Sequence, residues 1–337
     1  MGNVTRVPFR LGRPPQFKPD ELYEVPTEDG SAIAMGRYRS RVARRFAEPV
    51  VLGHSLATNR FNLDYDERYS VARYLARRGF ETWVLELRGH GLAGSARGSS
   101  FDIEATHDVS AALKTVLSTG AKGVMWVGHS RGGLLAYAHL ARRPDAPIRA
   151  VVTLASPVTF EAQPGVKRFV AAMRPALGLG LEVIPLRLAT RPVIAFGLPP
   201  DPVGKYLVRK ENMEPHMIRA AIAHISADVS GGVVRQLARW VETGAFDGDD
   251  GFDYRAGMKA IRAPVLALAG VCDFIAPPSS VHLAGSLVSG HSELVTVGRA
   301  TGFSDDYGHG DLVLGRRAPD EVFPRIAEFL EAHATAV

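Results

Sequence analysis

The chain has 337 residues, of which 46% are hydrophobic and 22% are charged, so it can bury a large core and is not expected to be globally disordered. Its net charge of +5 comes mainly from 33 arginines against 7 lysines. These residues are scattered and do not form a basic stripe interleaved with aromatic side chains, which argues against nucleic-acid binding. At this length, an α/β core with an insertion fits as well as two separate domains.

The cysteine content and the apolar tracts of the sequence indicate where in the cell the protein is expected and whether it spans a membrane. The single cysteine, Cys272, excludes an internal disulfide and a four-cysteine zinc site, and it is compatible with a reducing compartment. Residues 1–16 lack the apolar stretch of a secretory signal, and charges and prolines interrupt the most apolar long tract, residues 175–200. We therefore expect a cytoplasmic protein without a stable membrane span. The sequence leaves its oligomeric state open.

From the amino terminus, twenty proline-rich residues predict an irregular arm, and apolar patterns then predict alternating strands and helices. The predicted strands are residues 21–26, 31–39, 49–53, 80–87, 123–127, 148–154, 264–271 and 293–297. The predicted helices are residues 66–78, 103–117, 134–142, 278–288 and 320–333. This alternation predicts an α/β fold with a mainly parallel central sheet covered by helices on both faces. Ligands of such sheets bind at the carboxyl ends of the strands.

The alternation lapses between residues 157 and 250, where helical or irregular stretches are rich in apolar residues and proline. We interpret this segment as a mostly helical cap, or lid, inserted into a core made of residues 1–156 and 251–337. Long insertions often carry function, although this one could also be structural bulk.

The sequence Gly-His-Ser-Arg-Gly at residues 128–132 follows a predicted strand and precedes a predicted helix. Side chains at Gly128 and Gly132 would clash with neighbouring backbone in the tight turn that this context requires. The turn would hold Ser130 out at the end of the sheet, beside helix amides that can face a developing oxyanion. We therefore predict that Ser130 is a nucleophile; the alternative is an ordinary glycine-rich turn.

A serine hydroxyl needs a base and an acid to become a good nucleophile at neutral pH. Asp273 comes directly after the strand at 264–271, at the sheet edge where Ser130 is expected. The other geometric option, the end of the strand at 148–154, offers no carboxylate before Glu161. Asp273 is therefore the predicted acid, and the alternative is a helix-capping or turn aspartate.

His309 lies between two glycines in a loop after the last predicted strand, where its ring can reach into a site. We predict that His309 is the base; the alternative is a histidine with a structural hydrogen bond. Five other histidines have unsuitable positions in the chain order: His54, His129, His282, His291 and His333.

Residues 89–94, Gly-His-Gly-Leu-Ala-Gly, match the dinucleotide-binding pattern G-x-G-x-x-G. That pattern should open a helix directly, but residues 95–100 have loop composition, and Asp108 lies within a predicted helix instead of ending a strand. We expect no NAD-type cofactor. The chain also has no recognised zinc or calcium motif, so no metal is expected.

The order Ser130, Asp273, His309 resembles that of the α/β-hydrolase superfamily. The resemblance covers most of the chain outside the predicted cap. Arg-Gly-His-Gly at residues 88–91 resembles an element of this superfamily, and residues 49–62 resemble its oxyanion loop.

More narrowly, residues 311–318 and the oxyanion loop resemble the serine esterase and lipase branch related to acid lipases and polyhydroxyalkanoate synthases. The synthases use a cysteine nucleophile, whereas this chain has Ser130. The loop also carries His54-Ser55 where the family usually has His-Gly.

The resemblance implies an oxyanion hole formed by the backbone amides of Leu56 and Arg131. It also implies a carboxylic ester hydrolase in which Ser130 attacks, His309 takes the proton and Asp273 holds the imidazolium, through an acyl-enzyme intermediate. The apolar cap suggests a small-molecule ester with a hydrophobic portion. An acyltransferase that uses the same triad with an alcohol or amine acceptor is the alternative, and a non-catalytic scaffold would normally have lost one of the three residues.

Overall fold

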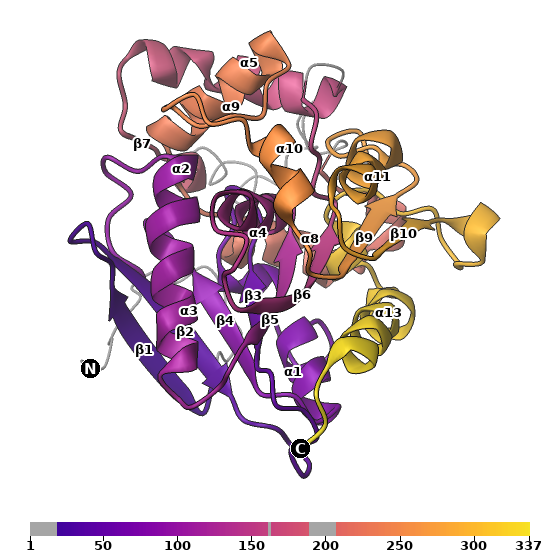
Figure 1. Cartoon of the computed structure of the whole chain (residues 1–337). Helices are drawn as coiled ribbons and strands as arrows, with labels where there is room; N and C mark the ends of the chain where they lie inside the picture. Colours follow the sequence, from indigo (N-terminus) through magenta and orange to yellow (C-terminus); the bar gives the residue numbers. More distant parts are fainter. Residues whose placement is uncertain (1–18, 161–162, 189–206) are drawn as a thin grey trace.

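The computed structural model describes residues 19–160, 163–188 and 207–337; residues 1–18, most of the predicted irregular arm, lie outside these ranges. The described chain contains an eight-stranded sheet with the order β1-β2-β4-β3-β5-β6-β9-β10 (Figure 1). Its strands are β1 (Glu21–Pro26), β2 (Ala32–Tyr38), β3 (Val50–Gly53), β4 (Thr82–Glu86), β5 (Val124–His129), β6 (Ile148–Leu154), β9 (Val265–Gly270) and β10 (Ser292–Val297). The pairs β1–β2 and β2–β4 are antiparallel and the others parallel, which confirms the mainly parallel sheet.

Helices cover both faces of this sheet. In the core they are α1 (Val71–Arg77), α2 (Phe101–Ile103), α3 (Val109–Leu117), α4 (Arg131–Arg142), α10 (Tyr254–Gly257), α11 (Pro278–Leu287), α12 (Asp311–Leu314) and α13 (Ala318–His333). A π-helix, Glu104–Asp108, joins α2 to α3. Short 3-10 turns lie at Arg60–Asn62, Met258–Ala260 and Arg299–Thr301.

Strand β5 shows how the core is divided between the two faces. Met125 and Val127 belong to the apolar cluster that includes residues of α1 and α13, whereas Val124 and Trp126 belong to the cluster that includes α3 and α4. Successive side chains of a strand point to opposite faces, so a continuous apolar run is what a strand buried on both sides requires. All six residues of β5 are buried.

The helix predicted at residues 66–78 begins later, at Val71. The Asp66 side chain accepts hydrogen bonds from the backbone amides of Arg68 and Tyr69, which favours a turn there. Ser70 then caps the helix by accepting from the amide of Arg73. The predicted start was therefore wrong because polar side chains compete for the backbone.

Strands β6 and β9 are neighbours in the sheet, and the chain between them carries the additional segment 157–250. Its described elements are α5 (Pro164–Gly178), β7 (Val183–Ile184), a 3-10 turn (Lys210–Asn212), α8 (Pro215–Ala220), a π-helix (Ala221–Ile225), β8 (Val229–Ser230) and α9 (Gly231–Thr243). Strands β7 and β8 form a two-stranded antiparallel sheet that the sequence did not predict. Helices α5 and α9 lie together beyond one end of the large sheet, at the top of Figure 1. The interpretation of this segment as a cap stays a prediction.

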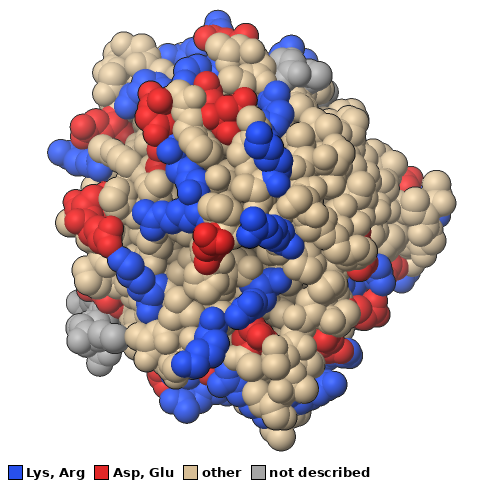
Figure 2. All heavy atoms as spheres, viewed as in Figure 1, with Lys and Arg blue, Asp and Glu red and all other residues tan. Residues whose placement is uncertain are grey.

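Two surface properties concern the described residues. None of their helices is long and apolar enough to cross a membrane; part of the apolar tract, residues 189–200, lies outside the described ranges. On the face shown in Figure 2, basic and acidic side chains are intermixed.

Candidate active site

Ser130 sits in the sharp turn between β5 and α4. Its backbone has φ 53° and ψ −114°, a left-handed conformation that is rare outside glycine and is associated with functional sites. A Cβ on Gly128 would lie 2.3 Å from the carbonyl carbon of Gly132, and one on Gly132 would lie 2.1 Å from the carbonyl oxygen of Gly53. The turn therefore requires both glycines, as the sequence predicted.

The structure brings Asp273 and His309 into contact, although 36 residues separate them. Nδ1 of His309 is 2.8 Å from Oδ2 of Asp273, and both side chains are buried. The other carboxylate oxygen of Asp273 accepts hydrogen bonds from the amides of Ile275 and Ala276 at 2.8 Å each. Asp273 is thus both the predicted partner of the histidine and the turn aspartate that was the alternative.

The loop that carries His309 lies directly against the Ser130 turn. Nε2 of His129 is 3.1 Å from the backbone carbonyl oxygen of His309, and the two rings are 5.1 Å apart between centroids. Ser130 and His309 are each only slightly exposed, at 8% and 5%. The His309–Asp273 pair therefore lies beside the turn that carries Ser130, and a catalytic role for the three residues stays a prediction.

Two of the rival histidines, His291 and His333, stack on each other away from the Ser130 turn. Nδ1 of His333 is 2.9 Å from the carbonyl oxygen of Phe329 one turn earlier in α13, and its ring stacks on His291 at 6.1 Å. Burial lowers the pKa of His129, beside Ser130, to about 3.

Asp311, two residues after His309, fixes this loop to the 157–250 segment. Its carboxylate accepts hydrogen bonds from the amide of Gly308, the amide of Arg209 and the side-chain amide of Asn212, at 2.8 to 3.1 Å. Burial nevertheless raises the pKa of Asp311. From the sequence, residue 311 belonged only to a stretch with a family resemblance, because Arg209 and Asn212 lie about 100 residues earlier.

The predicted oxyanion loop also contacts the 157–250 segment. Leu56 packs against a small apolar cluster of Ile184, Val229 and Val234. The next residue, Ala57, has φ 55°, and its carbonyl oxygen accepts from the amide of Ala227 at 2.8 Å. The inserted segment therefore contacts this loop through both side chains and backbone.

Arg131, the residue after Ser130, has a buried side chain whose contacts were not predicted from the sequence. Its Nη1 donates to both carboxylate oxygens of Glu104 at 3.1 Å. Burial raises the pKa of Glu104 to about 7 although the Arg131 charge acts in the opposite direction. Burial, together with the Arg131 charge, lowers the pKa of His90 to about 3.

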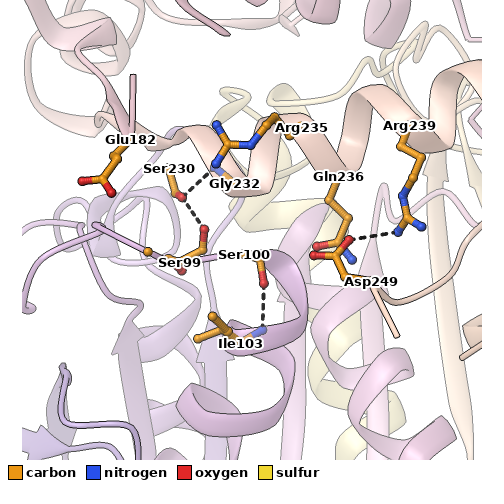
Figure 3. Close-up of a pocket in the computed structure, with 11 residues that line it drawn as sticks. Ser99, Ser100, Ile103, Glu182, Ser230, Gly232, Arg235, Gln236, Arg239 and Asp249 are labelled. Atoms are coloured by element: carbon orange, nitrogen blue, oxygen red, sulfur yellow. Dashed lines mark hydrogen bonds and ion pairs between the residues drawn. The ribbon is translucent and has the colours of Figure 1, made fainter. Parts of the chain in front are cut away.

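A cavity of about 480 Å³ lies apart from these residues, between the loop before α2 and helix α9 (Figure 3). Ser99 and Ser100 line it from the core, and Arg239 lines it from α9, paired with Asp249 at 3.3 Å. Neither Ser130 nor its predicted partners line this cavity. In the described ranges, no group of three or more His, Cys, Asp or Glu side chains could hold a metal ion.

Solved structures with a similar fold include esterases and a lipase, and they identify the architecture as the α/β-hydrolase fold. An esterase from Thermogutta terrifontis aligns with a TM-score of 0.63 at 18% identity, covering 94% of this chain and 100% of that chain. A monoacylglycerol lipase from Paleococcus ferrophilus aligns with a TM-score of 0.60 at 20% identity, covering 89% and 99%. The predicted fold class is confirmed.

The chain belongs to the family described as "Serine aminopeptidase, S33", whose model matches residues 58–300. Mouse lipase member M is 28% identical over 169 residues, which are 44% of this chain and 40% of that protein. Human gastric triacylglycerol lipase is 29% identical over 143 residues, or 38% and 36%. The chain therefore matches less than half the length of these curated relatives. The predicted membership of the α/β-hydrolase superfamily is confirmed, and so is the predicted resemblance to esterases and lipases.

Proposed function

We propose that this chain is a serine hydrolase that cleaves carboxylic esters with a hydrophobic portion through an acyl-enzyme intermediate. The observation that carries the proposal is the 2.8 Å contact between His309 and Asp273 beside the strained turn at Ser130. A carboxylate on Nδ1 leaves Nε2 of the imidazole free to accept a proton and stabilises the imidazolium that forms.

In this mechanism the Ser130 oxygen attacks the ester carbonyl while Nε2 of His309 takes its proton. The amides of Leu56 and Arg131 stabilise the negative charge on the former carbonyl oxygen. His309 then returns the proton to the departing alcohol, leaving an acyl group on Ser130. Water, activated by His309, attacks this acyl group, and the carboxylic acid leaves.

The hydrophobic portion of the substrate is inferred from the apolar residues beside the proposed oxyanion loop. Leu56 packs on Ile184, Val229 and Val234, and partly buried residues of α5 such as Phe169 and Met173 join the same cluster. Apolar walls close to a reacting carbonyl favour an acyl chain or alcohol that leaves water on binding. The names of the lipase relatives agree with this substrate class.

The test is hydrolysis of p-nitrophenyl esters of increasing acyl length, with Ser130→Ala as the control. We expect turnover by the wild type and a loss on the order of a thousandfold or more in kcat for Ser130→Ala. Equal, slow turnover by both proteins would contradict the proposal. Because the family description names an aminopeptidase, aminoacyl p-nitroanilides form a second series. Cleavage of these amides without cleavage of esters would replace the ester-hydrolase assignment with an aminopeptidase assignment. Analysis of the products formed when alcohols or amines are added distinguishes acyl transfer from hydrolysis.

A further inference from the structure

We propose that the Arg131 side chain positions the other half of the oxyanion hole by fixing the peptide between Ser55 and Leu56. The proposal rests on the proposed function, in which the backbone amides of Arg131 and Leu56 share the oxyanion. Arg131 then has two roles. Its backbone amide is one oxyanion donor, and its guanidinium orients the backbone N–H of Leu56, which is the other donor. In this second role Arg131 is a positioning residue.

The geometric basis is the carbonyl group of Ser55. Its oxygen is 2.9 Å from Nδ1 of His54, accepts from Oγ1 of Thr58 at 2.9 Å, and accepts from Nη2 of Arg131 at 3.4 Å. The Ser55 carbonyl and the Leu56 N–H belong to the same peptide unit. A trans peptide is planar, so its C=O and N–H point in opposite directions, and holding the oxygen fixes the direction of the Leu56 N–H. No described peptide bond is cis.

The neighbouring histidines have tautomers that suit this arrangement. Nε2 of His54 accepts from the amide of Leu87 at 3.2 Å, so the proton lies on Nδ1 and is donated to the Ser55 carbonyl. Nδ1 of His90 is 2.8 Å from the carbonyl oxygen of Arg88, which leaves Nε2 to accept from Nη2 of Arg131 at 3.3 Å. The same guanidinium nitrogen therefore lies between the Ser55 carbonyl and His90.

Glu104 holds the other arm of the guanidinium. The Arg131 and Glu104 side chains are 4% and 0% exposed, so each charge needs the other. Glu104 opens the π-helix between α2 and α3, and Asp108 at its end pairs with Arg88 at 2.6 Å. The wider π turn presents both carboxylates to buried arginines, and π-helices are frequent at functional sites.

This arrangement requires arginine. The planar guanidinium presents several N–H groups in fixed directions, so it can bind Glu104 and reach Ser55 and His90 together. A lysine ammonium is a compact charge and cannot keep the same set of contacts. Arg131→Lys therefore keeps the backbone donor and the charge but loses control of the Ser55–Leu56 peptide.

The test compares an ester with the matching thionoester in the full chain. Sulfur accepts hydrogen bonds more weakly than oxygen, so the rate ratio of ester to thionoester reports the alignment of the oxyanion donors. For Arg131→Lys we expect kcat on the ester to fall about 10- to 100-fold, below the 10²- to 10³-fold typical of removing a donor outright. KM should stay within about threefold, and the ester-to-thionoester ratio should fall. Thr58→Val, which removes one donor at nearly constant shape, should change the ratio in the same direction by a smaller factor.

Glu81→Gln is the matched control. Glu81 is a buried carboxylate paired with Arg37 at 2.7 Å, just before β4 and at the opposite end of the sheet from Ser130. We expect its ester-to-thionoester ratio to equal that of the wild type. If Arg131→Lys does not fold, the double variant Arg131→Met/Glu104→Gln removes both charges and takes its place, because such replacements of buried pairs are often tolerated.

An unchanged ratio in the Arg131 variant, or an equal loss of rate on both substrates, would overturn the proposal. Crystal structures provide a readout that does not depend on activity: the Ser55 carbonyl should turn from its wild-type direction in the Arg131 variant but not in Glu81→Gln. A Ser55–Leu56 peptide that keeps its orientation would also overturn it. If the wild type hydrolyses no ester, the proposed function is refuted but this inference is not. The orientation of the Ser55–Leu56 peptide in the Arg131 variant, compared with the wild type, would then decide the inference.

Discussion

The side-chain oxygen of Asn62 lies 2.9 Å from Nδ1 of His129, the residue before Ser130. The same oxygen accepts the backbone amide of Ser55 at 3.1 Å. One amide side chain thus joins the proposed oxyanion loop to the turn that carries the proposed nucleophile, at a site where Asn62 is 2% exposed. We expect the spacing between the two halves of the proposed site to depend on this contact.

Asn62→Leu should therefore reduce both stability and turnover. It leaves the buried Ser55 amide without an acceptor, which costs about 1 to 3 kcal/mol of unfolding free energy, measured by urea denaturation. A shift of the loop should also lower kcat on a p-nitrophenyl ester by about tenfold or more. Gln236→Leu, which removes the acceptor of the Phe101 amide away from the site, should lose stability and retain kcat. A similar loss of kcat in both variants would contradict a specific role for Asn62.

Asp273→Asn should retain the fold and lose activity. The asparagine oxygen can still accept from the amides of Ile275 and Ala276, but its NH₂ group would face Nδ1 of His309 and favour the wrong tautomer. We expect kcat to fall on the order of 10³- to 10⁴-fold at unchanged thermal stability. Asp253→Asn is the matched control, because Asp253 caps α10 through the amide of Ala256. A kcat within tenfold of the wild type for Asp273→Asn would remove Asp273 from the mechanism.

Gly132→Ala should disrupt the Ser130 turn. The added Cβ would stand 2.1 Å from the carbonyl oxygen of Gly53, so the backbone of β3 or α4 must move. We expect at least about 2 kcal/mol of destabilisation in urea, together with loss of ester hydrolysis. At Gly178, in α5, a Cβ would meet nothing within 4 Å, and Gly178→Ala should be neutral or stabilising. A Gly132→Ala protein with wild-type stability would show that the close approach of β3 and α4 is not rigid.

His139 should make stability depend on pH. Burial, with a smaller contribution from the Arg143 charge, lowers its pKa from 6.5 to about 4, so the folded state holds this proton less tightly than the unfolded state. The stabilising contribution is therefore complete above pH 6.5 and is lost as the pH falls toward 4. In urea titrations across this window, the wild type should lose up to about 1.4 kcal/mol per pH unit more than His139→Gln.

The control for this experiment is Leu140→Ala on the same helix. It removes buried apolar volume without removing a titrating group, so it should lower the stability at every pH and keep the wild-type slope. A His139→Gln protein with the slope of the wild type would show that another group takes up the proton.

Local signals explain what could be predicted for the fold. The apolar run of β5, the glycines around Ser130 and the helix-forming residues after it act over a few positions, so the strand, turn and helix were predicted together. Asp273 and His309 were predicted because the alternation of strands and helices requires the ends of parallel strands to meet at one edge. Helix starts were predicted less well, as at Val71, where the Asp66 turn and the Ser70 cap displace the first turns of the expected helix.

The sequence by itself determined the sheet, the Ser130 turn and the identity of the three proposed catalytic side chains, because each depends on neighbouring residues or on chain order. Only the tertiary structure decided how the site is held together. The Arg131 side chain donates hydrogen bonds to Glu104 and to the Ser55 carbonyl, and the Asn62 side chain contacts His129. Asp311 accepts hydrogen bonds from two residues about 100 positions earlier in the chain. No local pattern encodes these contacts, since a buried charge or amide finds its partner only after distant segments have packed together.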